Sequence, residues 1–251
     1  MYHREGITEF LLSKIDFDKA KTFLDIGCGR GVYLIEAGKR ASIDSKLYGI
    51  DNMAKVIDAA QSLIQEDQRY QFNIGDVENG LDFEDESMDV IFSCNVLECI
   101  NNKPGLLKEI HRVLKPDGIC IMAHFDWDTQ IYNAIDKTLF RKVIAAYNDW
   151  QQPWMNSCDA WMGRRLHGVF NGSGLFIGKV FSHVLLETEY REGFKGYSVL
   201  NDEIAMLVDN QILDKDEFDA FRNQLEELAL RGEYFYSINM YAYVGHKSRN
   251  G

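Results

Sequence analysis

The stretch Thr22-Phe23-Leu24-Asp25-Ile26-Gly27-Cys28-Gly29-Arg30-Gly31 decides the fold of this chain. Its apolar first half predicts a buried strand, three glycines at alternating positions follow, and the apolar run after Gly31 begins a helix. Where a strand turns sharply into a helix, free backbone N–H groups face the carboxyl end of the sheet. Glycine permits positive φ there and lets a ligand approach the backbone without meeting a Cβ. The loop is therefore predicted to bind a polar ligand.

Two families use a loop of this kind. Dinucleotide-binding folds have the spacing Gly-x-Gly-x-x-Gly, whereas here Gly31 comes one residue early and Val32 holds the expected place. The observed Asp-x-Gly-x-Gly-x-Gly resembles motif I of the class I S-adenosylmethionine (SAM)-dependent methyltransferases. The residues downstream separate the two possibilities.

Composition limits the classes of function. A chain of 251 residues, 46% hydrophobic, suits one large α/β domain or a core domain with an insertion. A formal net charge of −12 argues against non-specific binding to nucleic acid or to an anionic membrane. The sequence has no run of about 18 apolar residues, and its first residues lack an apolar signal core. Five cysteines without Cys-x-x-Cys spacing predict a reduced, cytoplasmic protein without a metal site.

Strands and helices alternate through the first half of the chain. The pattern predicts an N-terminal helix over 7–15, followed by strands at 23–26, 46–50, 70–74, 88–93 and 119–123. Helices are expected between them, near 32–40, 53–65 and 106–114, and the turn Lys115-Pro116-Asp117-Gly118 is expected to end the last of these helices. The alternation predicts a parallel sheet covered on both faces.

The pattern changes after residue 125. It predicts helices at 136–147 and 163–170, an irregular Trp-rich segment at 151–161, and helical stretches near 202–209 and 215–231. Long alternating strands at 176–188 and 234–246 suit an antiparallel pair at the end of the sheet. We expect one domain over 1–251, with its core at about 20–125 and 175–248, a lid insertion at about 126–172 and a second helical insertion at about 195–232.

Two further segments carry the resemblance. The run from Asp89 to Glu98 resembles motif IV of the methyltransferase family, and the run from Leu107 to Gly118 resembles its helix and turn before strand five. The resemblance covers about residues 20–125. It implies an α/β, Rossmann-like, doubly wound sheet of seven strands with the last strand antiparallel, plus helical lid insertions.

Carboxylates follow two of the predicted strands. Asp51 ends the second strand about 20 residues after the glycine loop, where it can accept hydrogen bonds from both hydroxyls of a ribose; alternatively it caps the helix that begins near Met53. Asp76 resembles the acidic residue that contacts adenine in the family, with Val77 against the ring, or it is a turn residue.

The resemblance implies the remaining cofactor contacts. Asp25 would hold the amino group of SAM, directly or through the loop, or would bond only to loop amides. Cys94 and Asn95 would line the methionine end of SAM, although Cys94 also suits a small buried hydrophobe. The full predicted cofactor set is Asp25, Gly27, Cys28, Gly29, Asp51, Asn52, Asp76, Val77, Cys94 and Asn95.

His124 is the candidate catalytic residue. Methyl transfer needs a general base only if the acceptor holds a proton that it does not lose by itself. His124 follows strand five and could take that proton from a hydroxyl or an ammonium, or it could simply bond to a neighbouring loop.

Aromatic residues gather in the predicted lid, which holds all four Trp. They suit either the lid core or a substrate pocket, and an aromatic pocket in an acidic chain would suit an amine through cation–π contact. Arg164 could pair with a substrate carboxylate or lie at the surface, and the segment from Tyr2 to Arg4 could fold over the cofactor. The predicted substrate-binding residues are Trp127, Tyr147, Trp154, Trp161 and Arg164.

These patterns predict an enzyme that transfers a methyl group from SAM to a nitrogen or oxygen of a small molecule, leaving S-adenosylhomocysteine. No nucleic-acid or membrane partner is expected, and the sequence does not give the oligomeric state. A nicotinamide-dependent oxidoreductase and a non-catalytic SAM-binding protein remain as alternatives.

Overall fold

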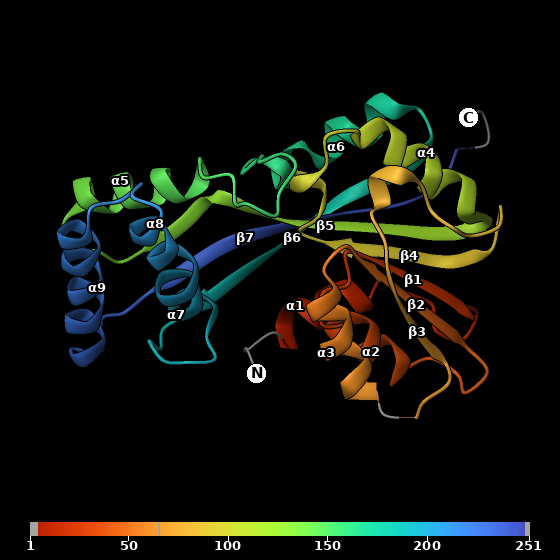
Figure 1. The fold of residues 1–251 in the computed structure, drawn as a ribbon, viewed down its shortest axis with the longest axis horizontal. Coiled ribbons are helices and arrows are strands. Elements are labelled where there is room, and N and C mark those ends of the chain that lie inside the picture. Colours follow the sequence, from red (N-terminus) through yellow and green to blue (C-terminus); the bar gives the residue numbers. More distant parts are fainter. Residues whose placement is uncertain (1–4, 65, 249–251) are drawn as a thin grey trace.

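The computed structural model describes residues 5–64 and 66–248, and one seven-stranded sheet runs through them in the order β3-β2-β1-β4-β5-β7-β6 (Figure 1). Strands β1 to β5 are parallel, and β7 is antiparallel to both of its neighbours. The strands are β1 (Thr22–Ile26), β2 (Lys46–Asp51), β3 (Tyr70–Ile74), β4 (Met88–Cys94), β5 (Leu114–Tyr132), β6 (Phe176–Glu187) and β7 (Tyr236–Lys247). This topology confirms the predicted fold class.

Helices cover both faces of the parallel part of the sheet (Figure 1). On one face lie α1 (Glu5–Leu12), α2 (Val32–Gly38) and α3 (Ala54–Ile64), and on the other lie α4 (Lys103–Val113) and α6 (Met162–Ser173). Two buried apolar clusters fill these two interfaces, because central parallel strands bury side chains on both faces. The short helices η1 (Val77–Asn79) and η2 (Leu97–Cys99) follow β3 and β4.

The far ends of β5, β6 and β7 extend beyond the core and carry a second lobe (Figure 1). Its helices are α5 (Lys137–Asn148), α7 (Lys195–Ser198), the π-helix η3 (Val199–Ile204), α8 (Ala205–Asp209) and α9 (Lys215–Leu230). Tyr132 and Tyr236 pack with tilted rings at 4.7 Å between centroids where the strands enter this lobe, and Phe221 of α9 packs against Tyr132. The long strands therefore connect the two lobes.

The fifth strand differs from the prediction at both ends. Residues 115–118 were predicted as a turn and Ile119–Ala123 as the strand, but β5 begins at Leu114 and runs to Tyr132. The pairing with β4 shifts register between Met88 and Val90, so the Pro-containing segment is accommodated as an irregularity within the ladder. The extension past Ala123 pairs with β7, and this long-range pairing has no signal in the local sequence.

Helix α6 lies in the range predicted as the lid but packs against β5, β6 and β7 of the core. Its side chains Met162, Leu166 and Phe170 are fully buried in the cluster on that face. Within the predicted lid, the end of α5 and the irregular segment 149–161 line a pocket described below. None of the helices in the described ranges, 5–64 and 66–248, is both long and apolar enough to cross a bilayer.

Candidate functional site

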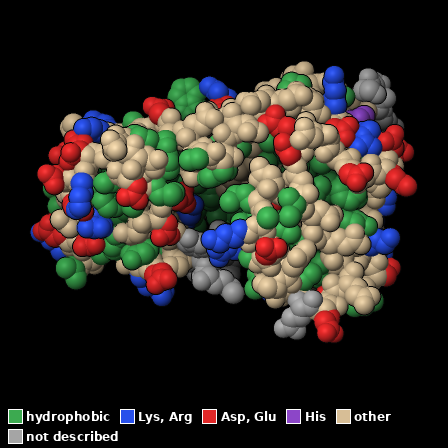
Figure 2. Space-filling model, in the orientation of Figure 1, with side chains coloured by type: hydrophobic (Ala, Val, Ile, Leu, Met, Phe, Trp, Pro, Cys, Tyr) green, Lys and Arg blue, Asp and Glu red, His purple; other side chains and the backbone are tan. Residues whose placement is uncertain are grey.

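Two pockets meet at the junction of the lobes, and the molecular face in Figure 2 is hollowed there. The glycine-loop pocket, about 260 Å³, lies at the carboxyl ends of β1 to β4 and includes Gly29, Asp51 and Asp76. The aromatic pocket, about 320 Å³, lies beneath the segment 148–160 and against the second lobe. Asn95 and Trp154 line both pockets, so the two spaces are adjacent.

The glycine loop has the positive φ angles that its glycines permit. Gly27, Gly29 and Gly31 have φ of 66°, 53° and 71°, which is the left-handed region that disfavours other residues. A Cβ on Gly27 would lie 2.2 Å from Val96, whereas a Cβ on Gly29 would meet no atom within 4 Å. Gly29 thus presents bare backbone to the open pocket.

The two strand-end carboxylates line the glycine-loop pocket and are held by backbone amides. Asp51 accepts hydrogen bonds from the amides of Gly29 (2.9 Å) and Met53 (3.0 Å), so it caps the following turn as well as facing the pocket. Asp76 accepts from the amide of Glu78 (2.9 Å) and caps η1. A carboxylate has about four acceptor positions, so each retains capacity for a ligand hydroxyl or amine.

Two of the predicted cofactor residues lie beneath the loop rather than on the pocket wall. Asp25 is 1% exposed and its Oδ2 has no hydrogen-bond partner among the described residues. Burial and the nearby Asp51 raise the pKa of Asp25 well above its usual value. Cys28 is buried, and its amide donates to the carbonyl of Ile50 (2.9 Å).

Asn95 forms the junction of the two pockets. Its backbone has φ of 60°, an uncommon value for a residue other than glycine, and such strain concentrates at functional sites. Its amide donates to the carbonyl of Ala123 (3.0 Å), and its Oδ1 accepts from the amide of Phe125 (2.8 Å). These bonds fix the tip of β4 against β5 and hold Asn95 between the pockets.

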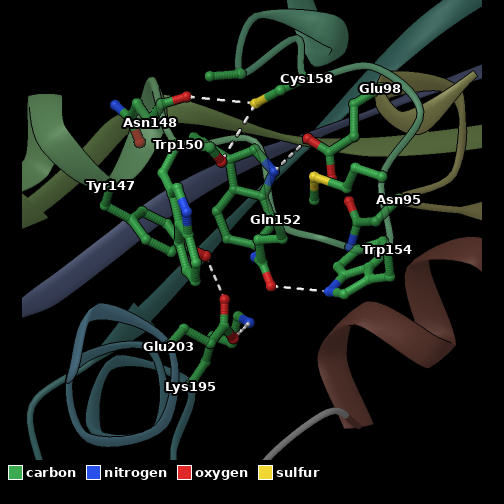
Figure 3. A pocket seen from close by; sticks show the side chains of 13 residues that line it. Asn95, Glu98, Tyr147, Asn148, Trp150, Gln152, Trp154, Cys158, Lys195 and Glu203 are labelled. Atoms are coloured by element: carbon green, nitrogen blue, oxygen red, sulfur yellow. Dashed lines mark hydrogen bonds and ion pairs between the residues drawn. The ribbon is translucent and has the colours of Figure 1, made fainter. Parts of the chain in front are cut away.

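The aromatic pocket takes its walls from distant parts of the chain (Figure 3). Trp127 comes from the extension of β5, Tyr147 from the end of α5, and Trp150 and Trp154 from the segment that follows. Trp127 and Tyr147 pack edge to face at 5.8 Å between ring centroids. Aromatic side chains therefore form much of the pocket wall.

Charged groups from three elements enter this enclosure. Glu98 of η2 is 3% exposed, and its Oε2 accepts a hydrogen bond from the indole N–H of Trp127 (2.8 Å). Lys195 of α7 donates to Glu203 (2.9 Å) and lies over the Trp127 ring at 5.1 Å, and Tyr147 also donates to Glu203. Burial raises the pKa of Glu98 to about 8.

His124 lies behind Glu98 and outside both pocket walls. It is 1% exposed, its Nδ1 is 2.8 Å from the carbonyl of Phe125, and its Nε2 is 3.7 Å from Glu98 Oε1. Because a carbonyl only accepts, Nδ1 carries the hydrogen and Nε2 presents a lone pair to Glu98. Burial lowers the pKa of His124 to about 4, so the ring is neutral at pH 7.

Two of the predicted substrate residues lie outside both pockets. Arg164 makes a two-pronged ion pair with the fully buried Asp126, and Trp161 is half exposed beneath the guanidinium groups of Arg164 and Arg165. Of the remaining predicted site residues, Gly27, Asn52, Val77 and Cys94 line the glycine-loop pocket, and Trp127, Tyr147 and Trp154 line the aromatic pocket. The predicted covering role of Tyr2 to Arg4 lies outside the described residues.

Sequence reasoning missed several charged and aromatic wall residues. Glu98 lies three positions after Asn95 within the motif IV run. Its position after the end of β4 could have identified it as a site residue. Trp150 directly precedes the Trp-rich segment predicted at 151–161 and belongs to the predicted lid, whose aromatic residues were recognised as a group. Lys195 and Glu203 come from helices that follow β6, and no local pattern connects them with the site.

The residues of the glycine-loop pocket fit SAM. Bare backbone at Gly29 and carboxylates at the ends of β2 and β3 provide polar groups on the pocket wall, and the buried Asp25, whose Oδ2 has no hydrogen-bond partner among the described residues, lies beneath the loop. Apolar side chains of Ile50, Val77 and Ile100 also line the pocket. Within residues 5–64 and 66–248, no group of three or more His, Cys, Asp or Glu side chains is placed to hold a metal ion.

Fold and site together define a class of protein, a Rossmann-like domain with its ligand crevice at the carboxyl ends of parallel strands. The sequence profile of a family described as "Methyltransferase domain" matches residues 17–174, which is more than half of the chain. The chain therefore belongs to the class I SAM-dependent methyltransferase family, and the resemblance inferred from the glycine loop is confirmed.

Named relatives share this domain. The chain is 31% identical over 131 residues to a mitochondrial arginine-hydroxylase of Mus musculus, covering 51% of this chain and 36% of that one. It is 30% identical over 168 residues to a 2-methyl-6-phytyl-1,4-hydroquinone methyltransferase of Synechocystis, covering 58% and 49%. It spans 34–39% of the length of several of the curated relatives that it matches.

A solved structure shares the fold. The phosphoethanolamine N-methyltransferase 2 of Haemonchus contortus in complex with SAM superimposes with a TM-score of 0.55 at 15% identity, covering 98% of this chain and 53% of that one. At this identity the likeness concerns the fold alone.

Proposed function

We propose that this protein transfers a methyl group from SAM to a nitrogen or oxygen atom of a small molecule, leaving S-adenosylhomocysteine. One observation carries the proposal: the pocket that fits SAM adjoins a second, aromatic pocket, and the two share Asn95 and Trp154. Bound SAM supplies the methyl group on a positively charged sulfur. A transfer enzyme must hold donor and acceptor in contact, and adjoining pockets provide this.

The residues of the glycine-loop pocket have distinct binding roles in this proposal. Asp51 would accept hydrogen bonds from ribose hydroxyls, and Asp76 with the backbone of Val77 would contact adenine. Asp25, Gly27, Gly29, Cys94 and Asn95 would hold the methionine portion, with Asp25 and Cys28 acting from beneath the loop.

The aromatic pocket would hold the acceptor and exclude water. Its volume of about 320 Å³ lies at the lower end of the range for small-molecule sites. The net charge of −12 supports a small acceptor over a nucleic acid. Among the related proteins, the Synechocystis enzyme is named for a hydroquinone acceptor and the Haemonchus enzyme for phosphoethanolamine.

Ligand binding followed by product analysis tests the proposal. SAM at 100 times its dissociation constant should stabilise the fold by about 2.7 kcal/mol, and NAD should not. Methyl-labelled SAM, incubated with the protein and a metabolite extract, should then yield one labelled product and S-adenosylhomocysteine.

The alternatives predict other outcomes. Stabilisation by NAD instead of SAM would indicate an oxidoreductase. If the protein binds SAM but forms no S-adenosylhomocysteine with any acceptor, it is a SAM-binding protein without transfer activity. A hydroxylated, unlabelled product would indicate the chemistry for which the mouse relative is named.

A further inference from the structure

We propose that the acceptor is a primary or secondary amine, and that Glu98 takes the proton this amine must lose before it can be methylated. The inference rests on the proposed function and narrows it. It selects nitrogen over oxygen as the methylated atom and assigns the proton of the acceptor to the Glu98 carboxylate. It stands on the placement of Glu98 at the wall between the aromatic pocket and a buried histidine.

Glu98 is almost fully buried yet reaches the aromatic pocket (Figure 3). Helix η2 begins directly after the loop that carries Asn95, so Glu98 lies close to the point where the two pockets meet. Its Oε2 is fixed by the indole N–H of Trp127 at 2.8 Å. A carboxyl group held in this way keeps one geometry toward the acceptor space.

The surroundings of Glu98 accommodate both of its protonation states. As a carboxylate, it is stabilised by the hydrogen bond that Trp127 donates to Oε2. As an acid, it faces through Oε1 the lone pair of His124 Nε2, 3.7 Å away, which has no hydrogen-bond partner within the described part of the chain. His124 is therefore a positioning residue that places a neutral ring behind Glu98 without a hydrogen bond to it, and it lines neither pocket.

The charges around Glu98 place its titration near neutral pH. Burial raises the pKa of Glu98 to about 8, the hydrogen bond from Trp127 opposes this rise, Glu203 and Asp159 add to it, and Lys195 opposes it. Other titratable groups nearby lie on every adjoining element: His124 on β5, Cys99 on η2, Tyr147 on α5 and Cys158 in the segment 149–161. A proton acceptor works best when its pKa lies near the operating pH.

This chemistry favours an amine over an alcohol. An alkylammonium has a pKa near 10.4, only about two units above that of Glu98, whereas the hydroxyl of water has a pKa of about 15.7. The lysine of the pocket is already paired with Glu203, so Glu98 gives the enclosure an additional negative charge when ionised. Trp127 already has Lys195 over its ring, but Trp150 and Trp154 also line the pocket, and aromatic rings attract cations.

The step balances in atoms and charge. The ammonium gives one proton to the Glu98 carboxylate, which becomes a neutral acid, and the nitrogen regains its lone pair. That pair forms the new N–C bond while the S–C bond of the donor breaks, and the electrons of that bond stay on sulfur. The methylated amine leaves as a cation, and Glu98 then releases its proton to water.

Titration of the protein without SAM tests the assignment directly. In ¹⁵N-labelled protein, the indole N–H signal of Trp127 should shift with a midpoint near pH 8, because its partner Glu98 ionises there. Adding n-butylamine should lower this midpoint, since a bound ammonium favours the carboxylate, and adding n-butanol should leave it unchanged. In Glu98→Gln the titration should vanish.

Glu203→Gln is the matched control because it alters the other carboxyl group of the same pocket. The titration of the Trp127 signal should persist there with a lower midpoint, since the negative charge of Glu203 raises the pKa of Glu98. With an identified acceptor, Glu98→Gln should lower kcat at least 100-fold, and His124→Gln should move the pH optimum while both variants bind SAM with wild-type affinity.

Adding 4-methylphenol to the same titration tests a phenol as the acceptor. Four results would overturn the inference: a midpoint below pH 6, a titration that survives Glu98→Gln, a shift with n-butanol equal to that with n-butylamine, or a shift with 4-methylphenol but not with n-butylamine. These failures are distinguishable from failure of the proposed function, which calorimetry with SAM tests separately. A protein that binds SAM but gives one of these results keeps the proposed function and loses only the amine and Glu98 assignments.

Discussion

The glycine-loop pocket and the aromatic pocket share a wall but are built differently. The first is made by residues at the ends of consecutive strands, mostly between positions 27 and 100. The second combines side chains from residue 95 to residue 203, drawn from both lobes. The comparison suggests that the donor site is determined by local strand-end chemistry and the acceptor site by the long-range pairing of β5 with β7.

The largest effect is expected from Gly29→Val. A side chain there projects into open space of the glycine-loop pocket, so SAM affinity should fall at least 100-fold, or about 2.7 kcal/mol. The left-handed backbone should also cost about 1–2 kcal/mol of stability. Calorimetry with SAM and a denaturant titration measure the two quantities.

Gly174→Val is the control for this backbone strain. Gly174 has φ of 69°, its Cβ would also meet no atom within 4 Å, and it caps α6 away from both pockets. This variant should lose similar stability and keep its SAM affinity. Equal SAM affinities in the two variants would refute the assignment of Gly29 to the donor site.

Arg164→Ala should reduce stability more than activity. It leaves the fully buried Asp126 without its ion-pair partner, at a cost of about 3 kcal/mol in the free energy of unfolding. Urea denaturation of Arg164→Ala, Asp126→Ala and the double variant measures the coupling between the two residues. If Arg164→Ala instead raised the KM for the acceptor without loss of stability, the role predicted from the sequence would be restored.

Asp51→Ala should weaken SAM binding at least tenfold, because charge-assisted hydrogen bonds contribute roughly 1.5–3 kcal/mol. Part of any effect could come from the lost bonds to the amides of Gly29 and Met53. Asp214→Ala is a suitable control, since Asp214 accepts from an amide two residues ahead at the start of α9, far from the pocket. Unchanged SAM affinity in Asp51→Ala would remove the ribose assignment.

The pH dependence of stability should reveal Glu98 and His124 together. The pKa of Glu98 is raised in the folded state. Its contribution to the free energy of unfolding is therefore fully present below the pKa of the unfolded chain and is lost as pH rises towards 8. The pKa of His124 is lowered to about 4, so its contribution is lost as pH falls below about 6.5. The two slopes oppose each other between about pH 4.5 and 6.5, and only that of Glu98 remains above.

Wild-type protein should therefore lose up to about 2 kcal/mol between pH 6.5 and 8 from this residue. In Glu98→Gln this loss should be absent, as measured by denaturant midpoints across that interval. A wild-type slope that persists in Glu98→Gln would assign the proton to another group.

The difference between the pockets also explains what the sequence could predict. The parallel strands, the glycine loop and the carboxylates Asp51 and Asp76 followed from local patterns, because strand ends and turns have chemistry that is visible within a few residues. The extension of β5 to Tyr132 did not, since it depends on pairing with β7 more than 100 residues later. Lys195 and Glu203 come from helices that follow β6, and only the tertiary fold brings them to the aromatic pocket.

For two side chains the sequence indicated the chemistry but not the partner. His124 was predicted to follow the fifth strand but lies within β5, and the sequence does not reveal that Glu98 stands between it and the pocket. Arg164 has the chemistry of a residue that binds carboxylates, and the carboxylate that it binds is Asp126 of the same chain. Residue type indicated the interaction, while the partner depended on tertiary packing.

The most direct test of the account is a crystal structure of the protein with S-adenosylhomocysteine. The account predicts the ribose at Asp51, the adenine at Asp76 and Val77, and the sulfur beside Asn95, facing the aromatic pocket. The ligand bound in another crevice, or bound here with its sulfur turned away from Asn95, would contradict it.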